Sequence, residues 1–197
     1  MVPSKRIQDA AEVVEWLRVA VHDISLTEDE RCRVAIPCFG ITQDHHHAIV
    51  LLVEHRLYAS SFSLLRIAFE SYVRGVWLSV CATDAEIKKV ANCWEPPKIN
   101  ILISAIEQTP GFEEKVLSRI KDQSWKAMCA YTHTGGLHIQ RWNTNETIEP
   151  SYSEPEIEEV LQLSEMLACM SVLGIAEIIG NQGLALKVYE RFCEFKN

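Results

Sequence analysis

The residues whose types and spacing could do chemistry are concentrated on one predicted helix, over residues 56–81. Arg66, Glu70 and Arg74 stand four positions apart, so they form a single stripe over two helical turns; we call them the arginine stripe. The helix around them is strongly apolar, and ionisable groups that become partly buried need partners. The arginine stripe therefore has two interpretations. It is either an ion-pair network that ties helices together, or an anion pocket in which Glu70 holds one arginine and the other is free for a phosphate or carboxylate.

The second candidate region is the polar loop YTHTGGLHIQRW, which begins at residue 131. Tyr131, His133 and Arg141 could supply a proton donor, a general base and an anion clamp, with His133 as the candidate catalytic residue. Gly135 and Gly136 permit left-handed backbone and the close approach of a ligand. The alternative is an ordinary helix end, at which glycine terminates the helix and the helix dipole favours His133. We expect this loop to close over the arginine stripe.

Metal and cofactor chemistry have weaker support. His45–His47 are consecutive, and neighbours on a helix point about 100° apart, so the three cannot share one ion. The better metal pairings are His47 with Glu54, or Asp44 with His47 and His55, but a solvated helix start is favoured. The sequence has no H-E-x-x-H, C-x-x-C, P-loop, G-x-G-x-x-G or G-x-S-x-G motif. We predict no metal and no cofactor.

Composition places the chain among ordinary soluble globular proteins. Of its 197 residues, 48% are hydrophobic and 23% charged, and the formal net charge is −8. This charge argues against a surface that coats nucleic acid generally, but it leaves room for a local basic pocket. Seven scattered cysteines indicate free thiols in a reducing compartment. The N-terminus acquires charges too early for a signal peptide, and the apolar run 166–180 is too short to span a bilayer, so we expect a cytoplasmic protein without a membrane segment.

Hydrophobic periodicity predicts helices to position these residues. They cover residues 5–24, 42–56, 57–81, 99–108, 112–131 and 184–195, and a long helix runs to about residue 179. Pro37 and Gly40 predict that a short element ends near Ala35 or Ile36. Capping boxes at Thr83–Glu86 and Ser153–Glu156 predict two helix starts. Residues 134–155 form the one long loop.

Strand signals are nearly absent, and no domain boundary or repeat is evident. The sequence therefore predicts an all-α, single-domain bundle over residues 1–197, with seven or eight helices, some of them short.

With these residues in view, the chain resembles an uncharacterised family of small bacterial helical proteins. That family couples a helix of pattern S-x-x-L-x-R-x-x-x-E-x-x-x-R-G-x-W-L, here Ser61 to Leu78, to a later Y-T-H-x-G-G loop with a following arginine. The match covers most of residues 42–152. It implies a fold and implies that the arginine stripe, His133 and Gly136 belong together, but it implies no activity.

More distantly, the arrangement is similar to HEPN-type helical bundles, which include RNases of toxin–antitoxin and phage-defence systems. The active members carry an arginine followed five to seven positions later by a histidine, and this sequence has no such pair. The resemblance implies an inactive or structural relative as readily as a nuclease.

Two function classes follow as expectations. The first is a homodimeric bundle that binds a small anionic ligand, or an RNA phosphate, between the arginine stripe and the His133–Arg141 loop; the dimer is suggested by excess apolar surface in residues 160–180. The second is a metal-independent RNase that uses His133, or one half of a toxin–antitoxin or phage-defence pair.

Overall fold

A computed structural model describes residues 4–24, 28–144 and 146–194. Over these residues the protein has nine helices and no strand, which confirms the predicted all-α class. Eight of the nine are at least eight residues long, in line with the expected seven or eight. The helices are α1 (Ser4–Ala20), α2 (Glu30–Glu54), α3 (Tyr58–Val80), α4 (Asp84–Ala91), α5 (Ile99–Ile106), α6 (Val116–Thr132), α7 (Gly136–Gln140), α8 (Glu154–Ile178) and α9 (Gln182–Glu194).

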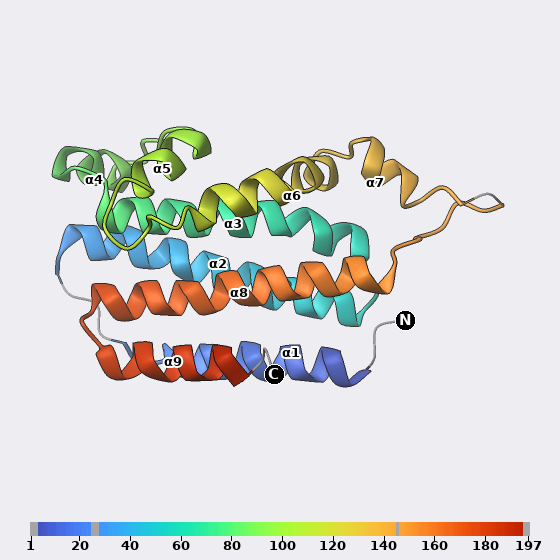
Figure 1. The fold of residues 1–197 in the computed structure, drawn as a ribbon, viewed down its shortest axis with the longest axis horizontal. Helices are drawn as coiled ribbons and strands as arrows, with labels where there is room; N and C mark the ends of the chain where they lie inside the picture. The colour runs from blue at the N-terminus through green and yellow to red at the C-terminus, as the bar shows by residue number, and fades with distance from the viewer. Residues whose placement is uncertain (1–3, 25–27, 145, 195–197) are drawn as a thin grey trace.

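The long helix α8 lies at the centre of the bundle (Figure 1). It packs against α2 and α3 on one side and against α1 and α9 on the other. The shorter helices α5 and α6 lie on the side of α3 that faces away from α8. This arrangement places α3, which carries the arginine stripe, between the central helix and an outer layer that can cover its charges.

Helix α2 differs from the prediction. Pro37 and Gly40 were expected to end a short element, but α2 runs unbroken from Glu30 to Glu54 with Pro37 inside it. Ala35 and Phe39 on either side of the proline are buried against the rest of the core. Their packing outweighs the cost of one missing helical hydrogen bond, so tertiary contacts override the local breaker signal.

Phe39 shows how tightly α2 approaches its neighbours. Its ring lies between Gly75 of α3 and Gly174 of α8. A Cβ atom on Gly75 would lie 2.8 Å from the ring, and one on Gly174 would lie 2.6 Å from it. The two glycines therefore leave the space that this ring fills.

The capping boxes are confirmed at both predicted helix starts. The Thr83 hydroxyl accepts from the backbone N–H of Glu86, whose carboxylate accepts from the backbone N–H of Thr83. Ser153 and Glu156 make the same pair at the start of α8. The loop over residues 134–155, predicted without regular structure, contains the short helix α7.

The apolar excess of residues 160–180 is largely accounted for within one chain. Helix α8 buries eleven of its residues against the four helices around it. It is also the one helix of the described residues that is long and apolar enough to cross a membrane by length and composition. Half of its most apolar stretch is buried inside the protein, and a core helix passes the same test.

Candidate functional site

The arginine stripe lies on α3 with its two arginines in different states. Arg66 Nε donates a 2.8 Å hydrogen bond to Glu70 Oε1, and both side chains are about four-fifths buried. Arg74 reaches the other oxygen of Glu70 only at 3.8 Å, and its side chain is 39% exposed. Among the described residues Arg74 donates no hydrogen bond. Glu70 thus holds Arg66 in place and leaves the guanidinium of Arg74 available to a ligand.

Arg66 is held from two further sides by residues of α6. Its Nη1 donates to His133 Nε2, and its guanidinium carbon lies 4.9 Å from the centre of the Trp125 ring. His133 caps the C-terminus of α6, and its backbone N–H bonds to Cys129 O. The structure therefore brings His133 to the arginine stripe, because α6 packs along α3.

The side chains of Ser63 and Thr132 fix the register of α6 on α3. The Ser63 hydroxyl lies 3.0 Å from the carbonyl of Tyr131, and the Thr132 hydroxyl lies 3.1 Å from the carbonyl of Ser63. These bonds lie next to His133 in sequence, so they set how close its imidazole comes to Arg66.

A groove of about 390 Å³ opens beside the arginine stripe. We call it the α3–α5 groove. Three cationic side chains, Arg66, Arg74 and Lys98, line it against the single carboxylate of Glu70. Lys98 is also the N-cap of α5, and no side chain caps that helix start. The positive end of the α5 dipole therefore adds to the cationic character of the groove. Its lining is completed by Pro96, Pro97, Ile99, Asn100 and Trp125.

Two of the predicted loop residues have other partners. Arg141 donates from Nε to Glu156 Oε1 at 2.7 Å, which ties the loop to α8. Burial acts to raise the pKa of Glu156, but hydrogen bonds from Ser153 and Arg141 outweigh it and lower that pKa. Tyr131 is buried edge-on against Phe62, with ring centres 4.9 Å apart. Neither residue lines the α3–α5 groove.

The backbone conformation of the Gly135–Gly136 turn differs from the prediction. The left-handed residue is Thr134, with φ of 53°, while Gly135 has φ of −73°. Gly135 is required by close approach, since an added Cβ would lie 3.1 Å from the Cα of Ala130. Gly136 starts α7 and has open space where a side chain would project. The turn thus closes α6 and starts α7.

The three histidines at 45–47 do not act as a set. His46 is buried, and its Nδ1 lies 3.0 Å from the hydroxyl of Ser164 on α8, while His47 is exposed. Within the described ranges no group of three or more His, Cys, Asp or Glu residues is placed to hold a metal ion. No disulfide bond joins any two of the cysteines that the structure describes.

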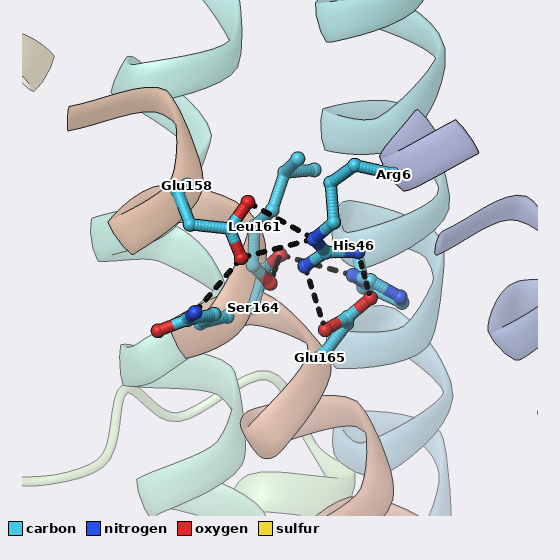
Figure 2. Close-up of polar contacts among 7 residues, drawn as sticks. Arg6, His46, Glu158, Leu161, Ser164 and Glu165 are labelled. Carbon is cyan, nitrogen blue, oxygen red and sulfur yellow. Dashed lines mark hydrogen bonds and ion pairs between the residues drawn. The ribbon is translucent and has the colours of Figure 1, made fainter. Parts of the chain in front are cut away.

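A polar cluster that the sequence analysis missed joins α1, α2 and α8 (Figure 2). Arg6 donates from Nε to Glu158 at 2.9 Å and from its two terminal nitrogens to the two oxygens of Glu165, both at 2.9 Å. We call Arg6, His46, Glu158, Ser164 and Glu165 the Arg6 cluster. Glu158 and Glu165 stand two helical turns apart on α8, so they share one face of the helix, and that spacing is the sequence signal that could have indicated the cluster.

The fold and the groove define the class: an all-helical protein with a cationic groove on an acidic chain. Within that class, the profile of a family of unknown function (DUF6988) matches residues 39–197, from the middle of α2 to the end of the chain. The chain belongs to this family. Comparisons with curated proteins and with solved structures give no match.

Proposed function

We propose that this protein binds a small anionic ligand, through a phosphate or carboxylate group, in the α3–α5 groove. The observation that carries the proposal is the local charge: three cations face one carboxylate on a chain whose formal net charge is −8. Cationic side chains that lie close together repel one another unless an anion compensates their charge.

The roles of the side chains follow from their partners. Arg66 is fixed by Glu70, His133 and Trp125, so it presents a rigid guanidinium. Arg74 has no hydrogen-bond partner among the described residues and can turn its planar fork to two oxygens of an anion. The uncapped start of α5 supplies backbone N–H donors from the opposite wall. In this proposal Lys98 is the third cation beside the anion, whereas the sequence predicted Arg141 for that role.

Titration calorimetry with inorganic phosphate tests the proposal. We expect saturable binding to the wild type and a loss of about tenfold or more in affinity for Arg74→Gln, because a charge-assisted hydrogen bond contributes about 1.5–3 kcal/mol. Arg33→Gln is the matched control, since Arg33 is an exposed arginine of α2 that does not line the groove. Equal phosphate affinity in wild type and Arg74→Gln would refute the proposal.

The source of the anion is a free metabolite or a nucleic-acid phosphate. A short single-stranded RNA, titrated in parallel with inorganic phosphate, separates the two. Tighter binding of the RNA, lost in Arg74→Gln, assigns the groove to nucleic acid. Binding of phosphate alone assigns it to a small ligand.

A second candidate function is a HEPN-like, metal-independent RNase, and the contact between His133 and Arg66 favours it. The contact sets an exposed imidazole, a possible acid or base, beside a guanidinium that could bind the phosphate. Cleavage of RNA in the presence of EDTA, abolished in a folded His133→Ala variant and retained in His55→Ala, would support it. An inert wild type would remove it.

We also propose that the protein is a cytoplasmic homodimer. What supports the dimer is a groove of about 550 Å³ between α6, α8 and α9, partly lined by Leu163, Met166 and Phe192, at which the described residues leave part of the apolar surface of α8 open. Light scattering after gel filtration measures the mass of the wild type. Co-purification of a different protein would favour one half of a toxin–antitoxin or phage-defence pair instead.

A further inference from the structure

A third cavity, which shares no lining residue with the α3–α5 groove, lies between α1 and α2. Its volume is about 350 Å³, within the range of small-molecule sites. We call it the α1–α2 cavity. Its wall is mostly apolar, formed by Val14, Leu17, Val21, Ile24, Ile36 and Ile175. The rest of the lining is Arg18 of α1 together with Gly40, Gln43, Asp44, His46 and His47 of α2.

His46 contributes a buried hydrogen-bond acceptor without a donor. The hydroxyl of Ser164 has one proton, and that proton goes to the carbonyl of Leu161 at 2.9 Å. For both contacts of this hydroxyl to be hydrogen bonds, the serine oxygen accepts from His46 Nδ1, which lies 3.0 Å away; Figure 2 shows the pair. The proton of the neutral ring is thus on Nδ1, and Nε2 is a bare acceptor that has no partner among the described atoms. His46 is only 1% exposed.

Gln43 contributes the complementary group one turn earlier on α2. Its side-chain Nε2 is also buried and without a hydrogen-bond partner. An amide nitrogen only donates, whereas the bare imidazole nitrogen only accepts. A buried polar atom left unpaired costs about 1–3 kcal/mol, and here two such atoms of opposite character belong to residues that line one cavity.

Gly40 keeps the cavity open from the same face of α2. It stands one turn before Gln43, and an added Cβ would meet no atom within 4 Å. Glycine in a helix interior costs about 0.5–1 kcal/mol relative to alanine. At Gly40 no neighbouring atom would clash with a side chain, so packing does not explain the glycine. At Gly75 and Gly174 it does, because the Phe39 ring occupies the space of a Cβ atom.

We propose that the α1–α2 cavity binds a small apolar molecule that carries one hydroxyl group, a phenol or an alcohol. The hydroxyl donates to His46 Nε2 and accepts from Gln43 Nε2, and the apolar body packs against the aliphatic residues of α1 and α2. A hydroxyl is the smallest group that satisfies both atoms, because it donates once and accepts as well. The site is independent of the α3–α5 groove and of the anion proposed there.

The test compares 2-naphthol with 2-methylnaphthalene, in which a methyl group replaces the hydroxyl at nearly the same size. We expect calorimetry to show saturable binding of 2-naphthol to the wild type, at least about tenfold tighter than 2-methylnaphthalene, since a site built for a hydroxyl discriminates against its absence. Gly40→Leu should abolish the binding of both, because the new side chain fills the cavity. Ile41→Leu, a neighbour that does not line the cavity, should bind as the wild type does.

Two further variants test the polar contacts separately from the space. Gln43→Leu and His46→Leu should each bind 2-methylnaphthalene and lose the preference for 2-naphthol. Gln43 is only partly buried, so that variant keeps the test decisive if His46→Leu fails to fold. The proposal is overturned if the wild type binds neither probe, which would leave the cavity to solvent. It is also overturned if a folded Gly40→Leu binds both, or if Gln43→Leu keeps the full preference.

Discussion

His46 sits inside the core next to Arg6, and burial, followed by the charges of Arg6 and His47, lowers its pKa from 6.5 to about 3. The unfolded chain takes up a proton on this histidine as the pH falls below 6.5, but the folded protein does so only near pH 3. The stability that depends on neutral His46 is therefore fully present above pH 6.5 and is lost as the pH falls from 6.5 towards 3.

We expect the free energy of unfolding to fall by up to about 1.4 kcal/mol per pH unit in this window on account of His46. Urea unfolding of the wild type and of His46→Leu between pH 4.5 and 7.5 measures it as the difference between the two slopes. His22→Gln, which replaces an exposed histidine outside the core, is the control for the loss of one imidazole. Parallel curves for wild type and His46→Leu would contradict the assignment.

Arg6 is the partner on which two carboxylates of α8 depend. Burial raises the pKa of Glu165, against the opposing effect of Arg6, so this carboxylate is already poorly solvated. We expect Arg6→Met to lower the free energy of unfolding at pH 7 by about 3 kcal/mol, because it leaves a largely buried charge unpaired. Arg18→Met, which removes an exposed pair with Glu15, should have no measurable effect. Chemical denaturation of the two variants makes the comparison, and equal stabilities would show that Arg6 adds nothing.

At the scale of helices, the contact between Phe39 and two glycines determines how closely α2, α3 and α8 pack. Gly174→Ala would place a Cβ 2.6 Å from the Phe39 ring, so we expect a loss of about 1–3 kcal/mol in stability. Gly40→Ala on α2 meets no atom within 4 Å and should instead stabilise by about 0.5–1 kcal/mol. Urea unfolding distinguishes the signs. In a Phe39→Leu background the penalty of Gly174→Ala should shrink, since the ring that it meets is gone.

Helix starts were predictable where their signals are local. The boxes at Thr83 and Ser153 each need residues three positions apart, and both formed as expected. Pro37 was misread because its effect depends on distant packing: α2 stays helical around it only because Phe39 is seated between α3 and α8. Helix α7 was missed because five residues are too few to show a helical period.

For the whole molecule, a local excess of positive charge on an acidic chain makes anion binding sensitive to salt. Raising NaCl from 50 to 500 mM should weaken phosphate binding at the α3–α5 groove several-fold, because the partly exposed Arg74 is screened. Binding of uncharged 2-naphthol at the α1–α2 cavity should change little over the same range. Calorimetry at both salt concentrations tests the two sites together, and salt-independent phosphate binding would contradict the electrostatic account.

Only part of the candidate site could be predicted from the sequence. The spacing of Arg66, Glu70 and Arg74 within one helix was readable, because four residues make about one turn. Lys98 and Trp125 were not, since only the packing of α5 and α6 on α3 brings them to the arginine stripe. Arg141 was placed there by its nearness to His133 in the chain, whereas the fold gives it Glu156 as a partner.

The bonds from Arg6 to Glu158 and Glu165 join positions 152 and 159 residues apart, nearly the full length of the chain. Closing so long a segment costs entropy, and the bonds form only once α8 has packed, so they should arise after the rate-limiting step of folding. Arg6 would then act mainly on the rate at which the folded protein opens. In stopped-flow experiments Arg6→Met should unfold faster than the wild type and refold at nearly the same rate. The N-terminal helix would thus lengthen the lifetime of the native state while leaving the time needed to reach it unchanged.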